Sequence, residues 1–136
     1  MNMISVNYVK GGNEVTTTKD PKKKFRKELN SGTTSLILLS VLAQADEPMY
    51  GYQIAKLITQ KSSDAPVMKQ GALYPVLRAL ASAEFLDSHV NPSVSGPPRR
   101  YYKITESGRE TLQEWEEIWK ETSSFIDNIL GGNHVG

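Results

Sequence analysis

The feature that most constrains this fold is a long segment near the C-terminus with a heptad repeat of apolar and small side chains. Six residues at alternating spacings of three and four make up the repeat: Leu112, Trp115, Trp119, Thr122, Ile126 and Ile129. Such a repeat is typical of a helix that packs along its length against another helix. A helix over about 25 residues extends about 37 Å. A chain of 136 residues offers little to cover it.

The simplest partner for this helix is a second copy of itself. Symmetric dimers are the commonest oligomers of soluble proteins, so we expect a homodimer interface at Leu112, Trp115, Trp119, Ile126 and Ile129. Tryptophans near a two-fold axis would leave a flat aromatic slot, which makes Trp115 and Trp119 candidate ligand-binding residues for a planar aromatic small molecule. The alternative is that the repeat serves packing alone.

Composition narrows the class of protein. The length fits one domain, and 38% hydrophobic residues with a net charge of +1 argue against disorder. The absence of cysteine excludes disulfides and thiolate chemistry and suits a reducing compartment. The longest apolar run, Leu36–Leu39, is far too short to span a membrane. We therefore expect a cytoplasmic protein with no membrane partner.

Charge is unevenly distributed along the chain. Residues 1–40 hold seven basic and three acidic residues, and residues 41–104 hold seven and five. Residues 105–136 hold two basic and seven acidic residues. The basic part is suited to face a polyanion, whereas the acidic end would point away from it.

Local patterns predict three helices, a hairpin and a long helix, in that order. Expected helices are Ser35–Ala45, Tyr50–Lys61 and Gly71–Ala83, and expected strands are Phe85–Val90 and Arg99–Ile104. Ser31–Thr34 offer N-caps for the first helix, and Pro75 is placed in the first turn of the third. Thr105 is the expected N-cap of the long helix.

This order predicts a mainly α fold with a small β-hairpin, a winged helix-turn-helix followed by a long C-terminal dimerisation helix. We expect a flexible N-terminal arm at 1–25, a DNA-binding domain at 26–104, the dimerisation helix at 105–130 and a disordered tail at 131–136. A dimer of this kind would match double-stranded DNA with a palindromic operator.

Polar and basic side chains recur where such a fold meets DNA. Gln70, Tyr74 and Arg78 share one face of the third helix, away from its leucines. The candidate DNA-binding residues are Tyr50, Lys69, Gln70, Tyr74, Arg78, Arg99, Arg100 and Lys103. The alternatives are that Tyr74 packs into the core, that Arg78 is merely solvated, and that the hairpin charges only prevent edge-to-edge aggregation.

Nothing in the sequence predicts an enzyme. The two histidines, His89 and His134, have no carboxylates at metal-ligand spacing, and no glycine-rich phosphate loop follows a strand. We expect no catalytic residues, no metal and no cofactor. The alternative function is a winged-helix protein-interaction adaptor that does not bind DNA.

Several motifs together resemble the PadR family of transcriptional regulators. They are Leu38–Ala43, Tyr50–Ile54, Gly71–Leu77, Gly96–Thr105 and Glu106–Gly108. The resemblance covers about residues 26–130 and implies a winged-helix domain, a dimer through the C-terminal helix, and repression that a small molecule relieves.

The chain is similar to the short branch of this family, which lacks a larger C-terminal domain and includes a multidrug-responsive repressor. In that repressor a dimer-interface tryptophan stacks on flat drugs, and Trp119 falls at the corresponding place. Ala72 and Pro98 depart from the family pattern, because a hydroxyl residue and an arginine are common there. These departures imply weaker or differently distributed DNA contacts.

Overall fold

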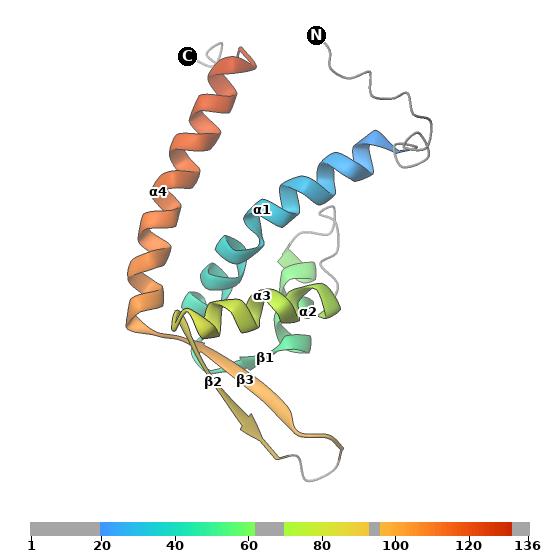
Figure 1. Ribbon diagram of the computed structural model, residues 1–136, viewed down its shortest axis with the longest axis vertical. Helices are drawn as coiled ribbons and strands as arrows, with labels where there is room; N and C mark the ends of the chain where they lie inside the picture. Colours follow the sequence, from blue (N-terminus) through green and yellow to red (C-terminus); the bar gives the residue numbers. More distant parts are fainter. Residues whose placement is uncertain (1–19, 62–69, 93–95, 132–136) are drawn as a thin grey trace. The chain divides into compact units, whose positions relative to one another are not determined.

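The computed structural model describes residues 20–61, 70–92 and 96–131 (Figure 1). In chain order its elements are α1 Pro21–Gln44, β1 Met49–Tyr50, α2 Gly51–Lys61, α3 Gln70–Ser82, β2 Leu86–Asn91, β3 Arg99–Ile104 and α4 Glu106–Ile129. The chain divides into two compact units, residues 1–33 and 34–136. The order of elements confirms the predicted mainly α, winged helix-turn-helix class.

Helix α1 begins much earlier than the sequence predicted. The carboxylate of Asp20 accepts a hydrogen bond from the Lys23 N–H at 3.1 Å, and Pro21 occupies the first helical position. The expected caps around Thr33 lie inside the helix. There the Thr33 hydroxyl donates a hydrogen bond to the Leu29 carbonyl of the preceding turn, at 3.0 Å. The expected start of this helix near Ser35 was therefore wrong, and residues 21–34 are helical.

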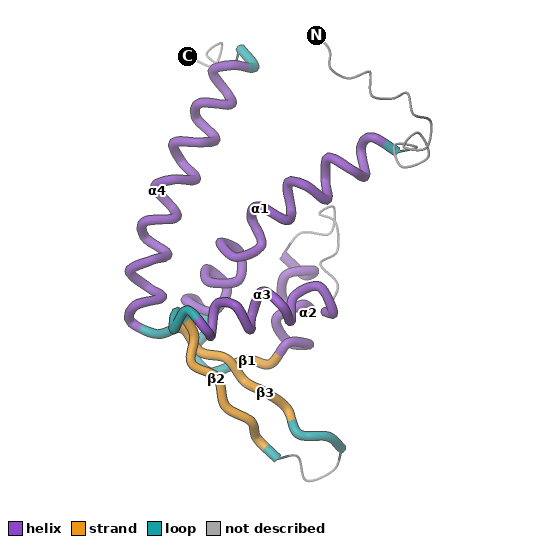
Figure 2. Tube along the Cα trace, in the orientation of Figure 1, coloured by secondary structure: helices purple, strands orange, loops and turns teal. Residues whose placement is uncertain are grey.

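The three strands form one antiparallel sheet in the order β1-β3-β2 (Figure 2). Strands β2 and β3 form the predicted hairpin, here called the wing, with Leu86 opposite Ile104 and Asn91 opposite Arg99. Strand β1 was not predicted, because its two residues are too few to show a period. It pairs with β3 and places Tyr50 beside Tyr101, which joins the wing to the start of α2.

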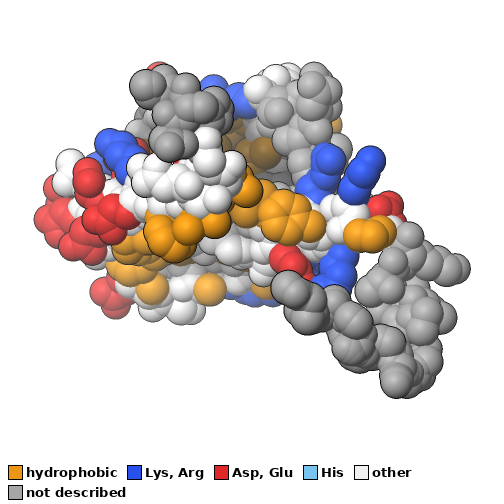
Figure 3. Space-filling view, turned by 90° about the horizontal axis from the view of Figure 1, so that it is seen from above, with side chains coloured by type: hydrophobic (Ala, Val, Ile, Leu, Met, Phe, Trp, Pro, Cys, Tyr) orange, Lys and Arg blue, Asp and Glu red, His pale blue; other side chains and the backbone are white. Residues whose placement is uncertain are grey.

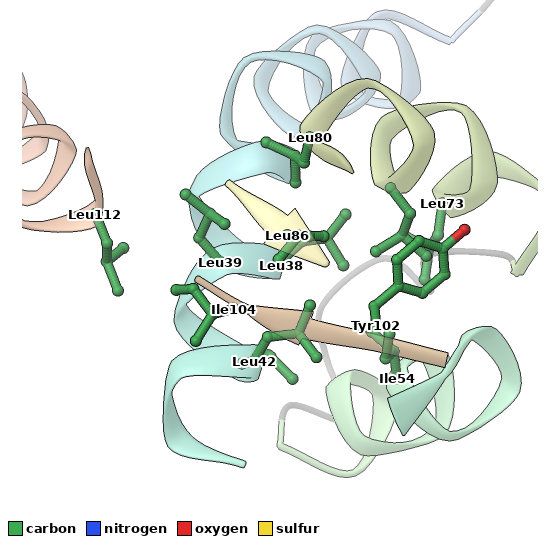
Figure 4. Close-up of a cluster of buried hydrophobic side chains, with 12 residues drawn as sticks. Leu38, Leu39, Leu42, Ile54, Leu73, Leu80, Leu86, Tyr102, Ile104 and Leu112 are labelled. Carbon is green, nitrogen blue, oxygen red and sulfur yellow. The ribbon is translucent and has the colours of Figure 1, made fainter. Parts of the chain in front are cut away.

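The core of residues 34–136 is built by every helix and by the two long strands (Figure 4). Helix α3 contributes Leu73, Leu77 and Leu80, which confirms the predicted apolar face of that helix. The other buried side chains are Leu38, Leu39, Val41, Leu42, Ile54, Leu86, Tyr102, Ile104 and Leu112. The wing and α3 are thus fixed on a common base.

A tight junction joins α3, β2 and α4. Helix α3 ends in a Schellman motif, in which Glu84 has a φ of 67° and the Phe85 N–H bonds to the Leu80 carbonyl at 3.0 Å. Thr105 is the predicted N-cap: its hydroxyl accepts the Gly108 N–H at 2.9 Å and donates to the Glu84 carbonyl at 2.8 Å. A side chain at residue 108 would overlap the Phe85 carbonyl oxygen, so glycine is required there.

Two smaller points concern helix boundaries. Helix α3 begins at Gln70, so Pro75 lies in its second turn rather than its first and removes one intrahelical hydrogen bond. Helix α4 ends at Ile129 with Leu130 as its C-cap, one residue before the end at Leu130 that the sequence predicted. Within the described ranges, none of the helices has an apolar stretch that would cross a membrane.

Candidate nucleic-acid interface

Helix α3 presents Tyr74 and Arg78 one turn apart. Arg78 is exposed, whereas Tyr74 is half-buried against the core. The Tyr74 ring lies over the N-terminus of α2, where a Cβ on Gly51 would come within 2.5 Å of ring atom Cε1. Tyr74 therefore packs partly into the core and remains partly exposed on its face of α3. Its ring fits against α2 because residue 51 is glycine and has no side chain there.

Arg99 and Arg100 of the wing contact different neighbours, because successive residues of a strand face opposite sides. The Arg100 guanidinium donates from Nη1 to the Ser88 hydroxyl on β2 at 3.1 Å. The Arg99 guanidinium carbon lies 4.4 Å from the centroid of the Tyr50 ring, a cation–π contact. The Tyr50 ring in turn meets Tyr101 edge-on at 5.3 Å. Both guanidiniums are exposed but held in place.

A groove of about 690 Å³ lies between the wing, α3 and the start of α2. Its lining includes Arg78, Arg99 and Arg100, with Tyr50 and Tyr74, and no Asp or Glu is among the described residues that line it. Pro97 and Pro98 of the wing also belong to the lining. We call this feature the arginine groove; its charge is suited to a polyanion.

Tyr102 lies at the floor of the arginine groove and was not among the predicted site residues. Its side chain is 2% exposed, and Figure 4 shows its hydroxyl at the edge of the buried cluster. Burial raises the pKa of Tyr102 above its ordinary value of 10.0, against the opposing effect of the positive charges of Arg100 and Arg78. The alternation along β3 places Tyr102 on the same buried face as Ile104, a position typical of a packing residue.

Of the predicted DNA-binding residues whose side chains are described, Lys103 is the one that does not line this groove. Lys103 lies on the opposite face of β3 from Tyr102, in register with Asp87. Lys69 falls outside the described residues, and Gln70 opens α3 but its side chain is not described. Tyr50, Tyr74, Arg78, Arg99 and Arg100 are brought together.

The heptad repeat on α4, here called the seam, divides into a part that the chain itself covers and a part that stays exposed. Leu112 is buried in the chain's own core, and Trp115 is half-buried with its ring edge-on to Phe85 at 5.9 Å. Farther along the helix, Trp119 is 44% exposed, and six apolar side chains in total are exposed between residues 118 and 130: Ile118, Trp119, Phe125, Ile126, Ile129 and Leu130. Figure 3 shows acidic side chains gathered at its left edge beside hydrophobic ones.

His89 is the one histidine within the described residues, and it takes part in the aromatic packing of the wing. Its ring stacks on Tyr101 with centroids 5.7 Å apart. In the part of the chain that the structure describes, no three acidic or histidine side chains gather closely enough to hold a metal ion.

Comparisons with known proteins give a consistent result. A family model described as "Transcriptional regulator PadR-like family" matches residues 38–114. The structure is similar to a PadR family transcriptional regulator from Eggerthella lenta, with 30% identity over 85% of this chain and 96% of that one and a TM-score of 0.71. A transcriptional regulator from Clostridium thermocellum shares 28% identity over 74% of this chain and 96% of that one, with a TM-score of 0.67. An uncharacterized protein from Lysinibacillus sphaericus is 28% identical over 79% of this chain and 96% of its own length.

Proposed function

Because this chain belongs to the PadR-like family of transcriptional regulators, we propose that it is a dimeric repressor whose α3 and wing bind operator DNA and whose release is triggered by a small molecule. Members of this family are DNA-binding transcriptional regulators and are generally not enzymes.

The arginine groove is the observation that carries the proposal. Three guanidiniums from α3 and the wing line one hollow, and its described lining holds no carboxylate. A major groove about 12 Å wide admits one helix, so α3 would enter it with Tyr74 and Arg78 toward the DNA. Arg99 and Arg100 would then hold the wing on neighbouring phosphates.

The exposed apolar end of α4 supports the dimer. Trp119, Ile126 and Ile129 recur at heptad spacing and remain exposed on a single protomer. Pairing of two α4 helices would cover them and present two copies of α3 to the half-sites of a palindrome. The acidic residues of α4 are on a different element from the groove arginines, so they need not face the DNA phosphates.

The two tryptophans support different roles within the proposed ligand response. Trp115 is occupied by its contact with Phe85, whereas Trp119 is exposed and available to stack on a planar ligand at the dimer axis. A ligand there would change the angle between protomers and so the spacing of the two α3 helices. Planar cationic or phenolic compounds should quench the fluorescence of the wild type and of Trp115→Phe, but not of Trp119→Phe. Equal quenching in all three proteins, or none, would overturn this part of the proposal.

The experiment that tests DNA binding is a mobility shift on duplex DNA from upstream of the gene at two salt concentrations. Phosphate-driven binding falls steeply with salt, with a slope near −0.9 per contacted phosphate. Arg99→Gln with Arg100→Gln should weaken binding and flatten that slope. Absence of binding at low salt would favour the adaptor function instead.

A further inference from the structure

Tyr102 is a buried side chain that carries a polar hydroxyl at the arginine groove. The side chain is 2% exposed, and no residue in the described ranges accepts or donates a hydrogen bond at this hydroxyl. Buried polar groups are hydrogen-bonded in the large majority of cases, so an exception calls for an explanation. Phenylalanine would fill the same place in the core without this cost.

The surroundings of the hydroxyl indicate what would bind to it. It belongs to the floor of the arginine groove, with Arg78 and Arg100 from two different elements near enough to affect its charge state. Burial raises the pKa of Tyr102, so the phenol stays neutral and remains a donor throughout the physiological range. One neutral donor and two permanent cations that line the same groove are a set that matches an oxyanion.

We propose that Tyr102, Arg78 and Arg100 form a seat for a single phosphate group, which in the proposed function is one backbone phosphate of the bound DNA. The inference rests on that function for its source of phosphate and goes beyond it in assigning a core residue of the wing to binding. The Tyr102 hydroxyl donates to a non-bridging oxygen, and the two guanidiniums neutralise its charge. The phosphate thereby fixes the distance between α3 and the wing.

The test compares two tyrosines that are neighbours on β3. Tyr102→Phe removes only the hydroxyl, and Tyr101→Phe makes the same change on the other face of the strand, outside the groove lining. Binding is measured by fluorescence anisotropy with a labelled 30-base-pair duplex from the upstream region, across a range of salt. Urea unfolding of each free protein is measured in parallel.

We expect Tyr102→Phe to lower the affinity at least about 10-fold, the usual size for a hydrogen bond to a charged group. Its salt slope should equal that of the wild type, because the substitution removes no charge. Arg78→Gln, in contrast, should flatten the slope by about 0.9 for each phosphate that the variant no longer neutralises. The free Tyr102→Phe protein should be as stable as the wild type or more stable. Tyr101→Phe should bind like the wild type.

A second probe separates failure of the seat from failure of DNA binding. Inorganic phosphate, added at constant ionic strength against chloride, should raise the unfolding temperature of the wild type more than that of Tyr102→Phe. If the wild type binds no duplex but shows this phosphate effect, the proposed function fails and the seat remains. If Tyr102→Phe and Tyr101→Phe bind the duplex equally well, the inference is wrong. It is also wrong if Tyr102→Phe loses stability together with affinity, because the hydroxyl is then structural.

Discussion

Glu84 adopts a backbone conformation that its side chain disfavours. Its φ of 67° lies in the left-handed region, and the Schellman motif there sets the direction in which the chain leaves α3. Glycine adopts this region at little cost. We predict that Glu84→Gly raises the free energy of unfolding by about 1 kcal/mol, as measured by urea denaturation. A loss of stability would show that the Glu84 side chain contributes more than the structure indicates.

Gly51 has a role that the sequence did not reveal. A methyl group there would collide with the Tyr74 ring, so Gly51→Ala should cost about 1–3 kcal/mol of stability and weaken DNA binding by moving Tyr74. Gly71→Ala is the matched control. Residue 71 has open space for a Cβ within α3, so the change should gain up to about 1 kcal/mol. Equal effects of the two changes in thermal unfolding would contradict this role of Gly51.

The raised pKa of Tyr102 also makes the stability of the protein depend on pH. Because burial raises its pKa in the folded state above the unfolded value of 10.0, the unfolded chain releases its proton first. The stability contribution is therefore complete below pH 10 and is lost as the pH rises through the folded pKa. Urea unfolding between about pH 9 and 11 should show a decline that is smaller in Tyr102→Phe. Identical declines in both proteins would contradict the shift.

At the scale of elements, α4 joins the chain's own core at Leu112 to an exposed apolar face that we propose pairs with a second copy. Ile126→Glu places a charge on the exposed seam, and Ser124→Glu places the same charge on a different face of the helix. We predict that Ile126→Glu shifts the proposed dimer toward monomer in size-exclusion chromatography with light scattering, while Ser124→Glu does not. Dissociation by both changes would mean that general repulsion, rather than the seam, is responsible.

The sequence predicted most elements because their faces follow simple periods. The leucines predicted to face the core on α3 are buried, whereas the heptads of α4 identified one face of that helix, of which Leu112 alone is fully buried. It did not predict the start of α1, since the Thr33 hydroxyl bonds within the helix and Asp20 acts as the cap. It did not separate Leu112 and Trp115 from the rest of the seam either. A period identifies a shared face, but not whether the chain itself or a partner covers it.

For the candidate site too, the sequence predicted which residues are exposed and charged, but not how they contact one another. The exposed arginines were identified as charged positions on the third helix and the hairpin, and the structure brings Arg78, Arg99 and Arg100 to one groove. The role of Gly51 and the position of the Tyr102 hydroxyl depend on contacts between elements distant in sequence. Such contacts leave no local pattern.

At the scale of the whole molecule, the proposed α4 dimer would present two copies of the arginine groove to one duplex. In the proposed complex the dimer and the groove depend on each other, because a single α3 and wing would contact fewer phosphates than a pair on two half-sites. A monomeric variant such as Ile126→Glu should therefore lose most of its DNA affinity although its groove is unchanged. If a monomeric variant kept its DNA affinity, DNA binding would not depend on the α4 dimer.

The most direct test is sedimentation velocity of the wild-type protein with a labelled duplex from its own upstream region, at low and at physiological salt. The account predicts two protomers on each duplex at saturation, with no stable complex of one protomer, and a steep loss of binding as salt rises. A complex of one protomer per duplex, or free DNA throughout at low salt, would contradict it.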